Sequence, residues 1–214
     1  MHFIVQPPSR FLRAEITYEL FCRDSTLVWD FGSGLRLVSI QSSFRVRRME
    51  RDTTAQTLTL VADTPLGGTR QWLTIQYEGE PGSTGFGSFE VKAHETGYVL
   101  WTLSQPYGAR DWLFCQDDLS DKVDTLSVSV ETPPDYIGVA NGRLLADSLT
   151  AQGTRIRHFQ HNYPIATYLI AIAASNYAIQ TYTITTSFHS YTLTNYVFPQ
   201  DTARARTLTE SMLP

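Results

Sequence analysis

A histidine next to a glutamate is the first residue combination in this sequence that could carry chemistry. Two histidines four residues apart on a helix can bind zinc, and a glutamate between them can activate water for hydrolysis. The nearest string is His94-Glu95-Thr-Gly97-Tyr98, in which Tyr98 replaces the second histidine and Gly97 disfavours a helix. We therefore expect a surface pair near a β-hairpin at this point, and we assign no metal site.

The other titratable and nucleophilic residues give no catalytic site. His158 and His161 are three residues apart in an expected strand, so their side chains point to opposite faces. Cys22 and Cys115 are the two cysteines, and we expect two buried free thiols, with a single disulfide as the alternative. No serine or cysteine can be paired with a base from sequence, so the chain itself is not expected to be an enzyme.

The elements that must position any site are β-strands. In residues 12–22 apolar side chains alternate with polar ones, which is typical of a strand with one buried face. We expect Leu12, Ile16, Tyr18 and Leu20 to share that face. Similar runs, separated by turns rich in Gly and Pro, occur at residues 27–31, 35–40, 44–48, 57–61, 71–77, 87–91, 98–103, 126–130, 156–161, 167–173, 182–189 and 191–197.

This series of short strands predicts an all-β fold, a twisted antiparallel β-sandwich or saddle. The C-terminal segment is the exception, because residues 201–212 favour a short helix. Asp201 or Thr202 can cap this helix, and Ala203 and Ala205 are good helix formers.

Composition limits the classes of function. A chain of 214 residues with a hydrophobic fraction of 42% can fill a large core. A net charge of −4 without a basic run argues against nucleic acid as a partner, and no apolar stretch is long enough to span a bilayer. Residues 1–8 lack the layout of a secretion signal, so export would need a signal preceding them, and the compartment stays open.

The most informative segment runs from residue 102 to residue 122. It resembles a run in the N-terminal domain of the zinc aminopeptidases of peptidase family M1, roughly T-Q-x-E-P-x-x-A-R-x-x-F-P-C-x-D-x-P-x-x-K. The matching positions are Thr102, Gln105, Pro106, Ala109, Arg110, Cys115, Asp117 and Lys122. The residues around Tyr107-Gly108 look most like members from Bacteroidetes-type bacteria.

A second block agrees in order and spacing. Residues 139–144 and 163–171 resemble the v-S-N-G-x-L and P-I-s-x-Y-L-i-A runs that follow in the same family. The resemblance is close over residues 98–178 and rests on strand pattern alone over residues 10–97.

The resemblance implies a non-catalytic β domain over residues 1–198, with residues 199–214 as the start of a catalytic domain. The zinc would lie in that catalytic domain, and no cofactor is implied for this chain. Such a domain covers the active-site cleft. Its partners would be the catalytic domain of the same polypeptide and the amino terminus of a peptide substrate.

Gln105 is the candidate substrate-binding residue. The family usually has Glu at this position, where the side chain accepts a hydrogen bond from the free α-amino group of the substrate. A neutral amide can accept the same bond, although a charged acceptor is the stronger partner. Leu103 stands where the family commonly has Gln, a second polar group that lines the site, so either that contact is lost here or Leu103 forms an apolar wall for the first substrate side chain. The alternative for Gln105 is a polar residue at a strand end.

The charged residues of the first block are expected to be structural. Their position among buried residue types predicts a loop that is held by charge-assisted hydrogen bonds. The structural motif consists of Arg110, Cys115, Asp117 and Lys122.

A different class of function stays open beside this one. A stand-alone β-sandwich could bind peptide or glycan through exposed aromatic side chains, with Trp72, Trp101 and Tyr107 as candidates. Further alternatives are a scaffold or adhesion module and a relative that has lost its zinc site.

Overall fold

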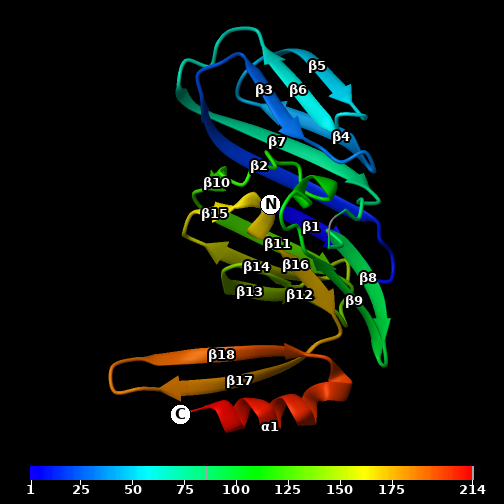
Figure 1. Cartoon of the computed structure of the whole chain (residues 1–214), viewed down its shortest axis with the longest axis vertical. Helices are drawn as coiled ribbons and strands as arrows, with labels where there is room; N and C mark the ends of the chain where they lie inside the picture. The colour runs from blue at the N-terminus through cyan, green and yellow to red at the C-terminus, as the bar shows by residue number, and fades with distance from the viewer. Residues whose placement is uncertain (85, 214) are drawn as a thin grey trace.

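The computed structural model describes residues 1–84 and 86–213. These residues form eighteen β-strands, three 3-10 helices and one α-helix, so the predicted all-β class is confirmed (Figure 1). No helix within the described residues is long and apolar enough to cross a membrane.

The largest sheet has seven strands in the order β13-β14-β11-β1-β2-β7-β4. Neighbouring strands are antiparallel except β1 and β11, which run parallel, so the expectation of antiparallel pairing misses this one pair. The strands are β1 (His2–Val5), β2 (Leu12–Cys22), β4 (Leu35–Ser42), β7 (Thr69–Gly79), β11 (Leu126–Thr132), β13 (Arg143–Leu149) and β14 (Arg155–His161).

Two smaller sheets complete the sandwich, one near each end of the large sheet (Figure 1). The first packs through Trp29, whose ring lies 4.8 Å from that of Tyr18 on β2. The second approaches β11 so closely that a Cβ on Gly138 would lie 2.6 Å from Val130 Cγ1. The first contains β3 (Thr26–Asp30), β6 (Thr57–Ala62) and β5 (Val46–Asp52); the second contains β12 (Ile137–Ala140), β16 (Ile172–Ser175), β9 (Gly97–Thr102) and β8 (Phe89–His94).

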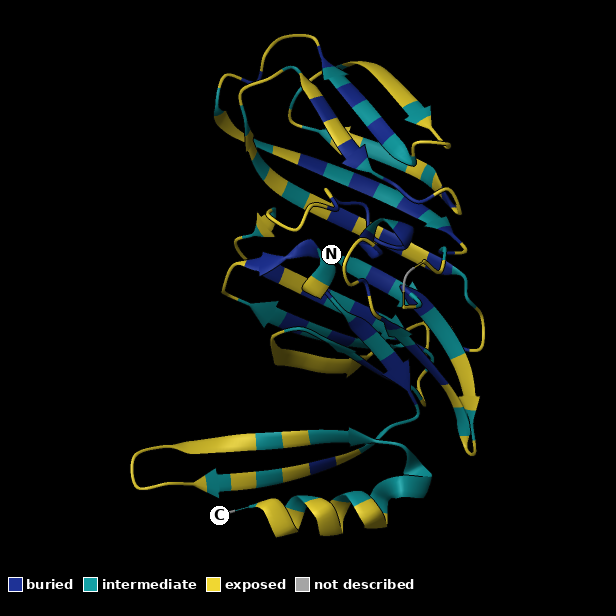
Figure 2. Cartoon of the chain, viewed as in Figure 1, coloured by how far each residue is buried: buried dark blue, intermediate teal, exposed yellow. Residues whose placement is uncertain are grey.

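Buried and exposed side chains alternate along β2 as expected, and Figure 2 shows the same alternation along the other long strands. Leu12 and Ile16 are fully buried. Tyr18 and Leu20 are only partly buried against the same core, which corrects the expectation for these two. Tyr18 combines ring packing with a polar contact, since its hydroxyl donates a hydrogen bond to the carbonyl of Phe114.

The expected strand over residues 167–173 is wrong for residues 167–171, and only residues 172 and 173 lie in a strand. The chain forms β15 (Ile165–Ala166), which pairs with β10 (Lys122–Val123), then a 3-10 turn η2 (Thr167–Leu169), and only then β16. Asn141 explains the interruption, because its amide donates to the carbonyl of Leu169 and its oxygen accepts from the backbone N–H of Ala171. Backbone groups held by a side chain in this way are not free to continue a strand ladder.

The C-terminal segment forms a separate unit at one end of the molecule (Figure 1). Strands β17 (Ala178–Thr185) and β18 (Ser190–Val197) pair with each other and, within the described residues, with no other strand. The 3-10 turn η3 (Pro199–Asp201) leads into α1 (Thr202–Met212), which confirms the predicted helix. Pro214, the last residue of the predicted second segment, lies outside the described residues.

Asp201 occupies the predicted N-cap position of this helix, but the predicted side-chain cap does not form. Asp201 has φ −98° and ψ 3° and makes no capping hydrogen bond, because η3 runs directly into α1. A capping residue normally has extended backbone, which lets its side chain reach the first free N–H groups. The Thr202 hydroxyl instead donates backward, to the carbonyl of Pro199.

We expect α1 to be marginally stable. None of its residues is buried, and an isolated helix of this length is weak in water. Its side-chain links to the hairpin include Asn195 Nδ2 to Thr209 Oγ1, at 2.8 Å. In hydrogen-exchange mass spectrometry, α1 should therefore exchange well before β2 and β7. Protection of α1 equal to that of β2 in a monomer would contradict this expectation.

Candidate functional site

The Gln105 turn, residues 103–108, leaves the sheet at the end of β9. Thr102 is buried there and accepts a hydrogen bond from the N–H of Ile172 at 3.0 Å. A hydrogen bond of 2.8 Å from the N–H of Gly108 to the carbonyl of Ser104 closes the turn. Gln105 and Tyr107 are exposed on it, and the peptide bond between Gln105 and Pro106 is cis. The side chain of Gln105 therefore faces solvent and lies outside the core.

The base of the turn is buried. Ser104 Oγ accepts a hydrogen bond of 2.9 Å from Trp112 Nε1, and both residues are almost fully buried. Between them lies the 3-10 turn η1 (Ala109–Asp111), and the Trp112 ring packs at 5.2 Å from the ring of Phe3 on β1. The exposed amide of Gln105 thus lies on a turn whose base, Ser104 and Trp112, is buried and hydrogen-bonded.

Arg110 and Asp117 form the charge-assisted network expected for this loop. Arg110 Nε lies 3.2 Å from Asp117 Oδ2, and Arg110 Nη1 lies 3.0 Å from Asp30 Oδ1. Asp30 also accepts from the N–H of Asp117 at 2.8 Å, a contact that no local sequence pattern signals. Burial raises the pKa of the Asp117 carboxyl, while the bonds from Arg110 act in the opposite direction.

Cys115 and Lys122 differ in their surroundings. The backbone of Cys115 forms an isolated β-bridge with Asp30, and its side chain is a buried free thiol. Burial raises the pKa of this thiol, and the nearby carboxylate of Asp117 raises it further. A thiol of this kind is a structural residue and a poor nucleophile. Lys122 lies exposed on β10 and forms no ion pair within the described residues, so it stands outside the Arg110 network. Cys22 is free but only partly buried, which corrects the expectation for that thiol.

The histidine–glutamate pair lies where the sequence places it, at a hairpin. His94 ends β8 and pairs with Gly97 at the start of β9. Its ring stacks on Phe198 at 4.4 Å, and its Nε2 lies 3.1 Å from Ser175 Oγ. Within the described residues no group of three or more His, Cys, Asp or Glu side chains could hold a metal ion. The described residues therefore do not fit a zinc site.

The candidate aromatic side chains do not form one platform. Trp72 is 43% exposed on β7 of the large sheet, opposite Glu19 on β2. Trp101 lies on β9 in the four-stranded sheet, with the Lys92 ammonium 5.2 Å from its ring centre. Tyr107 lies in the Gln105 turn. The three aromatics lie on different elements, and no ring pair within the described residues joins two of them.

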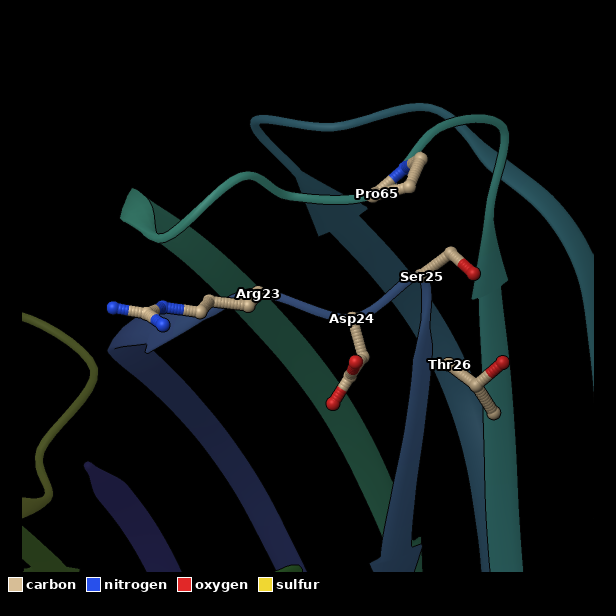
Figure 3. Close-up of a pocket in the computed structure, with 5 residues that line it drawn as sticks. All are labelled: Arg23, Asp24, Ser25, Thr26 and Pro65. Carbon is tan, nitrogen blue, oxygen red and sulfur yellow. The ribbon is translucent and has the colours of Figure 1, made fainter.

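An open surface hollow of about 410 Å³ lies at the start of β3 and includes no residue of the Gln105 turn in its lining. Arg23, Asp24, Ser25, Thr26 and Pro65 line it (Figure 3). The side chains of Arg23 and Ser25 point in opposite directions there, so polar groups do not converge on a common point. A binding site needs such convergence, and this hollow lacks it.

Residues 34–169 match the family described as the peptidase M1 N-terminal domain. The chain belongs to this family. The matched region includes the Gln105 turn, Arg110, Asp117 and Asn141, while Asp30 of the Arg110 network lies before it. No curated protein matches the sequence.

Solved structures of M1 zinc metallopeptidases share the fold, including structures of the enzyme from Deinococcus radiodurans. One mutant form has 24% identity and a TM-score of 0.77, covering 95% of this chain and 49% of that one. A mutant described as two-domain and bound to L-tryptophan has 24% identity and a TM-score of 0.76, covering 95% and 50%. A mutant bound to a Tyr-Ser-Ala substrate has 23% identity and a TM-score of 0.75, covering 97% and 50%. This M1 N-terminal domain chain thus spans about half the length of those structures.

Proposed function

We propose that this chain is the non-catalytic N-terminal domain of a zinc-dependent aminopeptidase. It covers the active-site cleft of the catalytic domain, and Gln105 accepts a hydrogen bond from the free α-amino group of the substrate. The observation that carries the proposal is an exposed glutamine on a turn with a buried base, within an M1 N-terminal domain.

The chemistry of Gln105 suits this task. The carbonyl oxygen of its amide can accept from an ammonium group, and only the amino-terminal end of a peptide offers an α-ammonium group. An acceptor at this point therefore favours removal of residues from the amino terminus over cleavage within a chain. A hydrogen bond from a charged donor is stronger than one between neutral groups, which makes the contact energetically useful.

Leu103 supplies a second element of the proposal. It precedes Gln105 on the same turn, and its side chain is 46% exposed. An apolar surface beside the amine acceptor would contact the first side chain of the substrate. We therefore expect peptides with an apolar first residue to be preferred over peptides with a charged one.

The boundary at residue 198 remains a prediction, and the fold suggests another place for it. The hairpin β17–β18 pairs with no sandwich strand in the described residues and hydrogen-bonds to α1 through Asn195. We propose that the hairpin belongs with α1 to the unit that follows the sandwich. The boundary would then lie at the link between β16 and β17, near Asn176.

The whole protein and this chain alone should differ in metal content and activity. The whole protein should hold one zinc ion and release single residues from peptides with a free amino terminus. This chain should hold no stoichiometric zinc and release none, because zinc needs three or four protein ligands. Elemental analysis and a peptide-release assay on both proteins check this.

Each outcome has a clear meaning. One zinc per chain in this domain, resistant to mild chelation, would overturn the non-catalytic assignment. A coding sequence downstream without H-E-x-x-H, or a whole protein that binds peptide without cleaving it, would favour the alternative of a binding module. Whole-protein zinc with amino-terminal cleavage supports the proposal.

A further inference from the structure

Asp111 is a buried carboxylate whose partners come from a single distant segment. Its side chain is almost inaccessible, and its Oδ2 accepts from the backbone N–H of Thr84 at 2.9 Å and from Thr84 Oγ1 at 2.5 Å. The Ser88 hydroxyl donates to the same oxygen. No cation pairs with Asp111 within the described residues, so these donors supply the compensation that a buried charge requires.

Ser88 connects this carboxylate to the Gln105 turn. Its carbonyl accepts a hydrogen bond of 3.2 Å from the N–H of Leu103, at the start of the turn. Its side chain lies against the end of the turn, since a Cβ on Gly108 would lie 2.8 Å from Ser88 Cβ. Ser88 itself is fully buried. One residue thus touches both ends of the turn that carries Gln105, and Asp111 holds that residue in place.

The segment that contains Ser88 is also held at its other end. Arg10 Nη2 donates to the carbonyl of Pro81 at 3.0 Å, between β7 and the Asp111 contacts. A carboxylate that binds two positions of this connection, Thr84 and Ser88, therefore limits how far it can move away from the turn. Loss of the carboxylate would leave the buried Ser88 hydroxyl without its acceptor and would release the exposed Thr84 from this contact.

We propose that Asp111 is a positioning residue for Gln105, acting through Ser88. The inference rests on the proposed function, because the position of Gln105 matters only if Gln105 meets a substrate. A hydrogen-bond acceptor must be held close to its productive position, and the buried carboxylate provides the fixed point for the turn.

The first test measures the turn in this chain, without any substrate. Hydrogen exchange at the amides of Leu103 and Gly108 reports the two hydrogen bonds that define the turn. In Asp111→Ala these two amides should exchange roughly tenfold faster relative to the wild type, while amides of β2 are unchanged. Asp111→Asn retains an oxygen acceptor, so it should restore most of the protection.

A matched control comes from Asp52, which also accepts hydrogen bonds from a nearby segment. Its Oδ1 accepts from the N–H groups of Thr54 and Ala55 at 2.9 and 2.8 Å, in the connection between β5 and β6. Asp52→Ala should leave the exchange of Leu103 and Gly108 unchanged. If Asp111→Ala does not fold, Ser88→Ala removes one donor alone and should accelerate the same two amides to a smaller extent.

The second test uses the whole protein. Asp111→Ala should raise KM for peptides with a free amino terminus by roughly tenfold and change kcat less, because a displaced acceptor weakens binding. The same substitution in a Gln105→Ala background should have little further effect. The Asp111→Asn variant should recover most of the lost affinity.

The outcomes separate this inference from the proposed function. Unchanged exchange at Leu103 and Gly108 in Asp111→Ala would overturn the positioning role, whatever the activity. Where Gln105→Ala itself lowers affinity, equal effects of Asp111→Ala with and without Gln105 would also overturn the positioning role and leave Asp111 as a residue of general stability. If Gln105→Ala alone has no effect on free-amino peptides, the anchor function fails, while the exchange result still decides whether Asp111 fixes the turn.

Discussion

Replacing Arg157 with alanine is expected to lower the free energy of unfolding by about 3 kcal/mol, because two hydrogen bonds from a charged donor are lost. Arg157 is 2% exposed on β14. Its guanidinium donates to the carbonyl of Gly138 at 2.9 Å and to the hydroxyl of Tyr196 at 3.0 Å. It also lies 5.4 and 5.2 Å from the ring centres of Phe159 and Tyr196.

These partners belong to three parts of the fold. Gly138 is on the four-stranded sheet, Phe159 on the large sheet and Tyr196 on the C-terminal hairpin, so Arg157 joins the hairpin to the sandwich. Its Nε lies 3.1 Å from Asp147 Oδ2 but lacks the alignment of a hydrogen bond. We therefore treat that contact as an ion pair of minor weight, since Asp147 is partly exposed and also binds Arg155.

Chemical denaturation of three variants tests the role of Arg157. Arg157→Met fills the space without a buried charge and is expected to lose much less stability than Arg157→Ala. Arg155→Ala removes the more exposed partner of Asp147 and should cost about 1 kcal/mol or less. Arg157→Ala should also accelerate hydrogen exchange in β18 more than in β2. Equal losses for Arg157→Ala and Arg155→Ala would contradict this assignment.

The second large effect is expected at Gln105 in the whole protein. Gln105→Ala should lower kcat/KM for peptides with a free amino terminus by roughly ten- to a hundredfold, since a hydrogen bond to a charged donor is worth about 1.5–3 kcal/mol. Gln105→Glu should keep or increase the affinity, because an ionised acceptor binds an ammonium group more strongly.

Two controls test this prediction. The fold of each variant can be checked by denaturation, and an exposed side chain such as Gln105 should change stability by no more than about 0.5 kcal/mol. For peptides with a blocked amino terminus, Gln105→Ala should lower kcat/KM much less than for free peptides, because blocked peptides offer no charged donor. An unchanged kcat/KM for free peptides would leave Gln105 as a polar residue at a strand end.

Strands with strict alternation could be predicted from sequence. The bounds of β2 were recovered in full, because apolar residues occupy every second position from Leu12 to Cys22, with exposed Phe21 as the one apolar residue out of phase. β13 was missed, since all its residues are exposed and no buried face imposes a pattern. β1 was missed as well. It has four residues, and its parallel pairing with β11 depends on residues more than a hundred positions away.

The candidate site could be predicted only in part, and for a related reason. Gln105 and Arg110 were found through a run of adjacent positions that resembles a family. Asp30 and Asp111 were not, because their partners lie 87 and 27 residues away and follow no periodic pattern. Contacts that depend on tertiary structure leave no local signal in a single sequence. The Thr167–Leu169 turn was not predicted for the same reason, since the side chain of Asn141, distant in sequence, interrupts the strand there.

The most direct test of the central claim is the energetic coupling between the Gln105 side chain and the amino group of a ligand. Two inhibitor peptides that differ only in the presence of the α-amino group are bound to the whole wild-type protein and to its Gln105→Ala variant. Inhibition constants give the coupling free energy without requiring turnover of either peptide. The proposed function predicts a coupling of about 1.5 kcal/mol or more, as for other hydrogen bonds to charged donors. A coupling within about 0.3 kcal/mol of zero would show that Gln105 does not meet the amino terminus and would contradict the account.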